Sequence, residues 1–210
     1  MKNFQERDLD SVTSLVNSPL HGKRVAFLGS SITYGCGPNG VSFVEYIAKR
    51  NGCMCYKEAV SGTTLVENTP ESYIKRLRKM DVNDKFDIFV CQLSTNDAAQ
   101  NMPLGDIDDN DTNTVTGAIR YIYQYVQDKW HCPFVMYTSA YYENRNYQKM
   151  VKRVKEMNYI NLIDMYSDVD FNNITDKQRK LYMLDGVHPT QAGYLEWWTP
   201  YIEEELSKFL

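Results

Sequence analysis

The sequence has few histidines and no apolar run long enough to cross a membrane. Only three of its 210 residues are histidine, namely His21, His131 and His188. No segment approaches the roughly 18 apolar residues of a membrane span, and residues 1–16 lack the apolar core of a signal peptide. We therefore expect a cytoplasmic protein, in which a reaction that needs a proton acceptor at neutral pH has three imidazoles to choose from.

The sequence also lacks an excess of positive charge. Its 23 basic and 27 acidic side chains leave a formal net charge of -4. Nucleic acids and anionic membranes are therefore not expected partners, because both attract basic surfaces. The content of 43% hydrophobic and 24% charged residues is typical of a globular protein. With no linker, repeat or shift in composition, residues 1–210 are expected to form a single domain.

A pattern of paired cysteines is absent as well. The five cysteines are odd in number and show no C-x-x-C spacing, which favours reduced thiols over a disulfide framework. Cys53 and Cys55 are two residues apart on one face of an expected strand, while Cys91 and Cys132 lie in or beside apolar runs. We expect most of them to be buried packing residues and predict no metal site.

Short apolar runs typical of strands alternate along the chain with amphipathic segments typical of helices. The expected strands are residues 24–29, 53–60, 86–93, 133–138 and 159–163. The expected helices are residues 42–50, 71–80, 113–130, 146–156 and 190–209, with a kink or break at Pro200. This alternation predicts a three-layer α/β/α domain with a parallel sheet covered by helices on both faces.

Polar segments follow the expected strands at the points where the strands end. Ligands of open parallel sheets bind beyond these carboxyl ends. Ser31 lies there in a glycine-flanked turn, where its hydroxyl can serve as a nucleophile. Gly62 lets a backbone N–H approach a ligand, and Asn96 offers a side-chain amide. Taken singly, such segments also serve as helix caps and turns.

The segment before the last expected helix carries an acid and a histidine three residues apart. Asp185 can orient the imidazole of His188 and stabilise its charged form. His21 and His131 precede strands instead, which places them at the amino ends, across the sheet from Ser31. Only His188 is therefore expected at the same edge as the serine.

Four segments in this order resemble the sequence blocks of the SGNH, or GDSL-type, hydrolase superfamily of esterases and lipases. They are residues 29–33, Gly62, residues 94–97 and residues 185–188, within a resemblance that extends over roughly residues 24–205. The resemblance implies a flavodoxin-like fold with a mostly parallel five-stranded sheet and no cofactor. It also implies roles for the matching residues: Ser31 as nucleophile, His188 as general base, Asp185 as orienting acid, and Ser31 N–H, Gly62 N–H and the Asn96 amide as oxyanion hole.

Two positions depart from the usual pattern of that superfamily. Ser30 stands where the first block usually has Asp, and Ser94 stands where the third block usually has Gly. Neither position supplies a reacting atom in the superfamily's mechanism. We therefore expect changes in loop geometry and substrate preference rather than a loss of activity.

Three other patterns in the sequence bear on this interpretation. Residues 35–40 read G-x-G-x-x-G, but the first glycine comes six residues after the strand, which is the wrong register for a dinucleotide fold. Residues 106–111 begin like a calcium loop but lack its glycine and closing glutamate, so a solvated loop that overhangs the site is expected. Three tyrosines near strand ends are candidate substrate contacts: Tyr34, Tyr141 and Tyr142.

The function expected from the sequence is hydrolysis of a small acyl ester, such as an O-acetyl group on a carbohydrate. A short-chain lipase, a thioesterase or a lysophospholipase of the same superfamily is an alternative, and so is a catalytically silent module that binds a glycan or acyl ligand. The expected partner is a small-molecule ester, and the sequence leaves the oligomeric state open.

Overall fold

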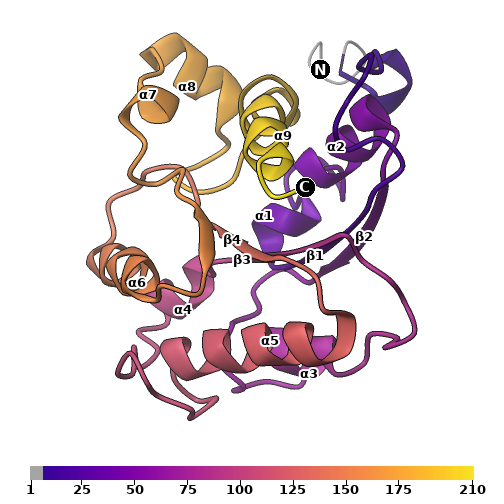
Figure 1. The fold of residues 1–210 in the computed structure, drawn as a ribbon. Helices are drawn as coiled ribbons and strands as arrows, with labels where there is room; N and C mark the ends of the chain where they lie inside the picture. The colour runs from indigo at the N-terminus through magenta and orange to yellow at the C-terminus, as the bar shows by residue number, and fades with distance from the viewer. Residues whose placement is uncertain (1–6) are drawn as a thin grey trace.

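A computed structural model describes residues 7–210, which contain a sheet of five parallel strands with helices on both faces (Figure 1). Its spatial order is β2-β1-β3-β4-β5, and every neighbouring pair is parallel. The strands are β1 (Arg24–Gly29), β2 (Met54–Ala59), β3 (Ile88–Gln92), β4 (Phe134–Tyr137) and β5 (Asn161–Ile163). The predicted α/β/α architecture is confirmed.

The burial of each strand follows its place in the sheet. All residues of β3 and β4 are buried, and only Arg24 of β1 is exposed. These strands lie between two helical layers, so apolar side chains are stable on both of their faces. The edge strand β2 is exposed or half-buried along its length. Cys53 directly precedes β2 and Cys55 lies within it, with 3.6 Å between their sulfurs, and all five cysteines are free thiols.

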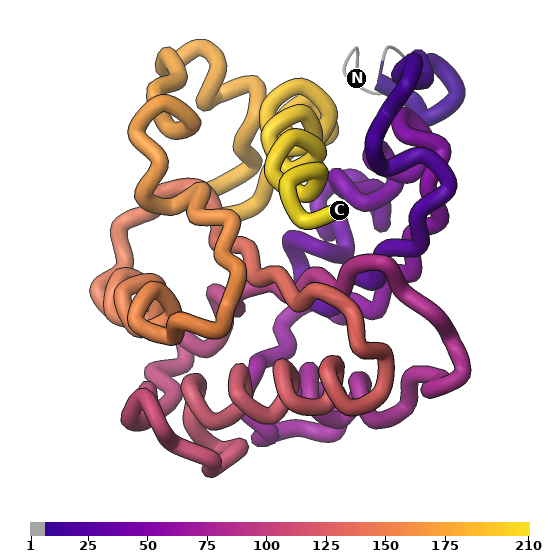
Figure 2. The backbone as a smooth tube through the Cα atoms, in the orientation of Figure 1, coloured from indigo at the N-terminus to yellow at the C-terminus, as the bar shows by residue number. Residues whose placement is uncertain are grey.

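Two hydrophobic cores lie between the sheet and the helices that cover it. One core joins it to α3 (Tyr73–Leu77), α5 (Val115–Trp130) and α6 (Arg145–Glu156). The other joins it to α2 (Phe43–Asn51), a π-helical turn (Gly193–Trp198) and α9 (Thr199–Ser207). Figure 2 shows α9 lying beside α2, and these two helices are in contact.

The expected helix at the end of the chain is continuous over residues 191–207 and contains a π-helical turn. This turn ends at Trp198, and α9 follows directly at Thr199, whose backbone is helical with φ -58° and ψ -52°. Proline has no N–H to donate to the preceding turn, so a helix that contains it must adjust its hydrogen bonds there. The adjustment at Pro200 is thus a π-helical turn just before that residue, and the helix does not break.

Several short helices were not anticipated, because they are too short for a periodic apolar pattern. They are α1 (Ser31–Tyr34), α4 (Thr95–Ala99), α7 (Val169–Asn172), α8 (Asp176–Tyr182) and a 3₁₀ turn (Leu9–Ser11). The expected helix at residues 71–80 is limited to the five residues of α3. Among the helices of residues 7–210, none combines the length and apolar character that a membrane span requires.

Candidate active site

Ser31, His188 and Asp185 form a continuous hydrogen-bonded series. Ser31 is the first residue of α1, directly after β1, and His188 lies in the loop between α8 and the π-helical turn. The distance from His188 Nε2 to Ser31 Oγ is 2.9 Å, and that from His188 Nδ1 to Asp185 Oδ2 is 2.8 Å. The arrangement has the geometry of a nucleophile, a base and an acid that orients the base.

The two carboxylate oxygens of Asp185 have different partners. Oδ1 accepts hydrogen bonds from the backbone N–H groups of Val187, at 2.7 Å, and His188, at 2.8 Å. Oδ2 is left to contact the imidazole. Burial opposes ionisation of this carboxyl, but the hydrogen bonds from His188 and the two backbone groups outweigh it and lower the pKa of Asp185. Asp185 therefore fixes both the backbone of the loop that carries His188 and the orientation of the His188 ring.

The turn that carries Ser31 is held by hydrogen bonds to Gln92, the last residue of β3. Gln92 is fully buried, and its Oε1 accepts hydrogen bonds from Ser30 N at 2.9 Å and Thr33 Oγ1 at 2.7 Å. A Cβ on Gly29 would lie 1.7 Å from Thr33 Oγ1. Glycine is thus required there for the close approach of the turn to Gln92.

Three N–H groups are candidates for an oxyanion hole, and they come from the segments that follow β1, β2 and β3. The backbone N–H groups of Ser31 and Gly62 have no hydrogen-bond acceptor within residues 7–210. Gly62 has a φ of +80°, in the left-handed region that glycine adopts at little cost. The Asn96 side chain donates one N–H to Thr63 O at 2.8 Å, which leaves its second N–H for a ligand.

Two neighbours of Asn96 set its position. Ser94 Oγ caps α4 by accepting hydrogen bonds from Asn96 N at 3.2 Å and Asp97 N at 3.3 Å. The Asp97 carboxylate is fully buried and accepts hydrogen bonds from Leu65 N at 2.8 Å and Val66 N at 3.2 Å. The serine that departs from the superfamily pattern thus has a structural use, and Asp97 ties α4 to the segment after Gly62.

The other two histidines lie at the opposite edge of the sheet. His131 follows α5 and precedes β4, while His21 precedes β1, and both are exposed. Neither has a polar contact with Ser31 or Asp185. The structure thus separates the three histidines as the order of strands predicts.

The three candidate tyrosines do not form one group. Tyr34 is 41% exposed on α1, with Lys57 Nζ 5.7 Å from the centre of its ring. Tyr141 is 51% exposed and packs against Tyr166, at 5.2 Å between ring centres. Tyr142 is half-buried against the same ring, and burial raises its pKa. Tyr34 and Tyr141 therefore have exposed faces that a ligand can contact, whereas Tyr142 mainly packs.

The G-x-G-x-x-G segment supports the histidine loop. A Cβ on Gly37 would lie 2.1 Å from Leu184 Cδ1 and 3.3 Å from Pro189 O. Both of these residues belong to the loop that carries Asp185 and His188. The glycine at position 37 therefore allows close packing of two loops, a use other than nucleotide binding.

The acidic loop at residues 106–111 contacts helices rather than the serine. Arg120 of α5 donates to Ile107 O at 2.8 Å and contacts Asp108, while Thr114 donates to Asp109 at 2.9 Å. Its observed polar contacts do not include Ser31 or His188. Across residues 7–210, no group of three or more His, Cys, Asp or Glu side chains is arranged to hold a metal ion.

Comparisons with known proteins bear on the family and the fold of the chain. The sequence model of the GDSL-like Lipase/Acylhydrolase family matches residues 27–195. No curated protein matches the sequence significantly. Among solved structures, a protein from Lactobacillus plantarum has 21% identity and a TM-score of 0.71, with 90% of this chain and 97% of that chain covered.

Two further structures carry functional descriptions. A candidate GDSL-like lipase from Bacteroides ovatus has 18% identity and a TM-score of 0.65, with 89% of this chain and 99% of that chain covered. An active-site mutant of a family two carbohydrate esterase from Clostridium thermocellum, solved in complex with a sugar, has 16% identity and a TM-score of 0.62. That comparison covers 90% of this chain and 65% of the esterase. At these identities the likeness establishes a shared fold.

Proposed function

Because the chain belongs to the GDSL-like lipase/acylhydrolase family, we propose that it is a serine esterase that hydrolyses small acyl esters through an acyl-serine intermediate. The observation that carries this proposal is the series Ser31–His188–Asp185, with both hydrogen bonds at 2.8–2.9 Å. The serine hydroxyl needs a base within hydrogen-bond reach to become a nucleophile at neutral pH, and His188 Nε2 is such a base.

In the first half of the reaction, Ser31 Oγ attacks the carbonyl carbon of the ester. His188 Nε2 takes the hydroxyl proton as the new C–O bond forms, and Asp185 stabilises the resulting imidazolium without accepting the proton. The carbonyl oxygen becomes an oxyanion and meets the N–H groups of Ser31, Gly62 and Asn96. His188 then gives its proton to the leaving alcohol, and the ester C–O bond breaks.

In the second half, a water molecule replaces the alcohol. His188 accepts a proton from this water as its oxygen attacks the acyl-serine, and the same N–H groups stabilise the second oxyanion. The bond to Ser31 Oγ breaks, the serine recovers its proton from His188, and the carboxylic acid leaves. Neither half requires a metal ion or an organic cofactor.

The substrate that we propose is an O-acetyl or similar short acyl ester on a carbohydrate. Tyr34 lies in the segment after β1 and Tyr141 in the segment after β4. Their exposed rings offer aromatic faces against which a sugar ring can pack. The similarity in fold to a carbohydrate esterase is a further support. The net charge of -4 disfavours negatively charged substrates, because like charges repel, and is compatible with a substrate that is uncharged around the acyl group.

The experiment that tests the proposal measures hydrolysis of p-nitrophenyl acetate, butyrate and longer esters by the wild type and by Ser31→Ala. We expect hydrolysis by the wild type to decrease as the acyl chain lengthens, and Ser31→Ala to show only background hydrolysis. Equal rates for the two proteins would overturn the esterase proposal and favour a silent binding module. A preference for long chains would instead assign a lipase, and release of acetate from acetylated xylan would support the carbohydrate ester.

A further inference from the structure

Arg76 is a buried arginine whose hydrogen-bond partners lie close to the proposed active site. It lies on α3, and only 2% of its surface is exposed. A buried guanidinium is stable only when its donors find acceptors, and removing such partners is costly. The positions of these acceptors therefore indicate which parts of the fold depend on the arginine.

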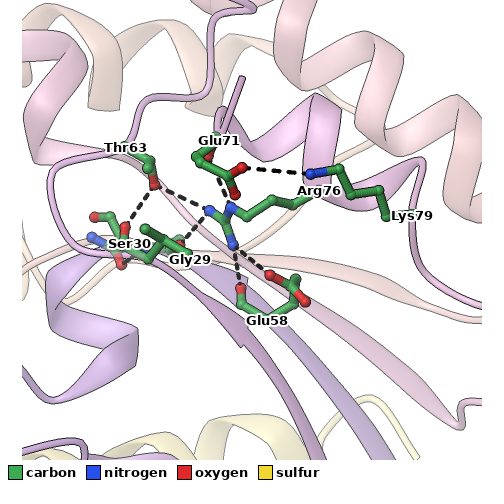
Figure 3. Close-up of polar contacts among 9 residues, drawn as sticks. Gly29, Ser30, Glu58, Thr63, Glu71, Arg76 and Lys79 are labelled. Carbon is green, nitrogen blue, oxygen red and sulfur yellow. Dashed lines mark hydrogen bonds and ion pairs between the residues drawn. The ribbon is translucent and has the colours of Figure 1, made fainter. Parts of the chain in front are cut away.

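The guanidinium connects segments at the carboxyl ends of two strands (Figure 3). Nη2 donates to Gly29 O at 2.7 Å and to Thr63 Oγ1 at 3.1 Å. Nη1 donates to Glu58 O at 2.8 Å and lies 3.3 Å from Glu58 Oε1. Nε donates to Glu71 O at 2.9 Å. Most of its partners are thus fixed backbone carbonyls rather than mobile carboxylates.

Two of these partners adjoin the proposed oxyanion hole. Gly29 precedes Ser31 by two residues, and Thr63 directly follows Gly62. The backbone also links the two segments through Val60 N and Gly29 O, at 3.3 Å, a longer contact than that of Arg76. A single nitrogen of Arg76 therefore holds both segments from which the backbone donors come.

We propose that Arg76 is a positioning residue that sets the distance between the N–H groups of Ser31 and Gly62. This inference rests on the proposed function of the site. The planar guanidinium presents donors in fixed directions, so it can reach the acceptors at Gly29, Thr63, Glu58 and Glu71 together, whereas a lysine ammonium cannot. Charged donors also form stronger hydrogen bonds than neutral ones.

The first test compares Arg76→Lys with Leu77→Ala in hydrolysis of p-nitrophenyl acetate. Leu77 is a fully buried neighbour on the same helix and takes no part in the hydrogen bonds of Arg76, so its truncation destabilises the fold through lost packing alone. We expect Arg76→Lys to lower kcat by roughly 100-fold with little change in KM, because a displacement of about 1 Å at a catalytic group has an effect of this size. Leu77→Ala should lower Tm but change kcat less than about twofold, the level expected when only packing is lost.

A second pair of variants changes the hydroxyl of Thr63 and leaves the guanidinium in place. This hydroxyl accepts a hydrogen bond from Arg76 and donates one to Val60 O at 2.7 Å, within the same segment. Thr63→Ser keeps the hydroxyl that accepts from Arg76, whereas Thr63→Val removes it. We expect Thr63→Ser to retain wild-type kcat and Thr63→Val to lose roughly tenfold. The double variant Arg76→Lys/Thr63→Val should lose less than the product of the two single losses, because both changes break the contact between Arg76 and Thr63. A wild-type kcat in Arg76→Lys and Thr63→Val, with only Tm reduced, would overturn the proposal.

Amide hydrogen exchange separates failure of this inference from failure of the proposed function. If the wild type hydrolyses no ester, or Ser31→Ala matches it, the esterase proposal fails. The role of Arg76 is then decided by exchange in residues 29–35 and 60–66, compared at equal global stability. Faster exchange in Arg76→Lys and Thr63→Val than in Leu77→Ala supports the positioning role, and equal exchange in all three overturns it.

Discussion

The side-chain amide of Asn96 donates a hydrogen bond to the backbone carbonyl of Thr63, with an Nδ2···O distance of 2.8 Å. The contact joins the segment after β3 to the segment after β2, next to Gly62. The amide is therefore held in place before any substrate binds, and its second N–H stays available. Donors that need no rearrangement during the reaction are the most effective in stabilising an oxyanion.

Replacing Asn96 by Ala should lower kcat for p-nitrophenyl acetate by roughly 100- to 1000-fold, the usual effect of losing one oxyanion donor. KM should change little, because the lost hydrogen bond strengthens in the transition state. Steady-state kinetics of the purified variant measure both constants. Asn161→Ala is the control, because Asn161 also donates its side-chain amide to a backbone carbonyl, that of Phe134 at 3.1 Å, but lies at the start of β5. An Asn96→Ala enzyme with wild-type kcat would remove this residue from the oxyanion hole.

Replacing Gly62 by Ala should reduce activity through the backbone rather than through a steric clash. A Cβ there meets no atom within 4 Å, but the φ of +80° is unfavourable for alanine by about 1 kcal/mol. The segment is expected to relax and turn its N–H away from the oxyanion, which lowers kcat while Tm falls slightly.

Gly22→Ala is the matched control for this variant. Gly22 also has a left-handed φ, +71°, and no atom within 4 Å of an added Cβ, but it precedes β1 at the opposite edge of the sheet. Its substitution should lower Tm to a similar extent and leave kcat near its wild-type value. Equal kinetics for the two alanine variants would show that the conformation at Gly62 is not needed for the reaction.

His188→Ala should abolish ester hydrolysis, with a loss in kcat of about 10⁴-fold or more, because Ser31 loses its base. His131→Ala should keep full activity, since His131 is exposed at the amino end of β4. Circular dichroism establishes that both variants are folded before their rates are compared. Loss of activity in a folded His131→Ala protein would contradict the assignment of the catalytic edge of the sheet.

Asp97 should make the stability of the protein depend on pH. Burial raises the pKa of this carboxyl to about 6, although the N–H groups of Leu65 and Val66 oppose the shift. The folded chain then binds a proton more tightly than the unfolded chain, in which the pKa is about 3.9. The free energy of unfolding should consequently fall by roughly 3 kcal/mol as the pH rises from about 4 to about 6, and level off above that.

Chemical denaturation at several pH values measures this contribution as the difference between the wild type and Asp97→Asn. The variant cannot ionise at this position, so its loss of the carboxylate hydrogen bonds adds only an offset that is independent of pH. The difference between the two unfolding free energies should decrease across the window from pH 4 to pH 6. Parallel curves would mean that Asp97 titrates alike in the folded and unfolded chains.

The residues that could be predicted from sequence share a local signal. Strand β1 was predicted with the correct bounds because apolar residues 25–28 are followed by a glycine and two serines. Gln92 and Arg76 carry no such signal. A glutamine at the end of an apolar run and an arginine on an amphipathic segment look like solvent-exposed side chains, yet both are buried. The partner of Gln92 at position 30 is 62 residues away in the chain, and the partner of Arg76 at position 29 is 47 residues away.

By itself, the sequence determined which residues could take part in the proposed chemistry and which edge of the sheet each one occupies. Local backbone preference and the pattern of burial determine where each strand ends. In a parallel sheet, residues that follow a strand lie at the carboxyl edge and residues that precede a strand lie at the amino edge. Only the tertiary structure decided the contacts. Ser31 and His188 are 157 residues apart, and their 2.9 Å hydrogen bond requires the packing of several loops over the ordered sheet. A hydrogen bond depends on distances of tenths of an ångström, which are set by long-range packing.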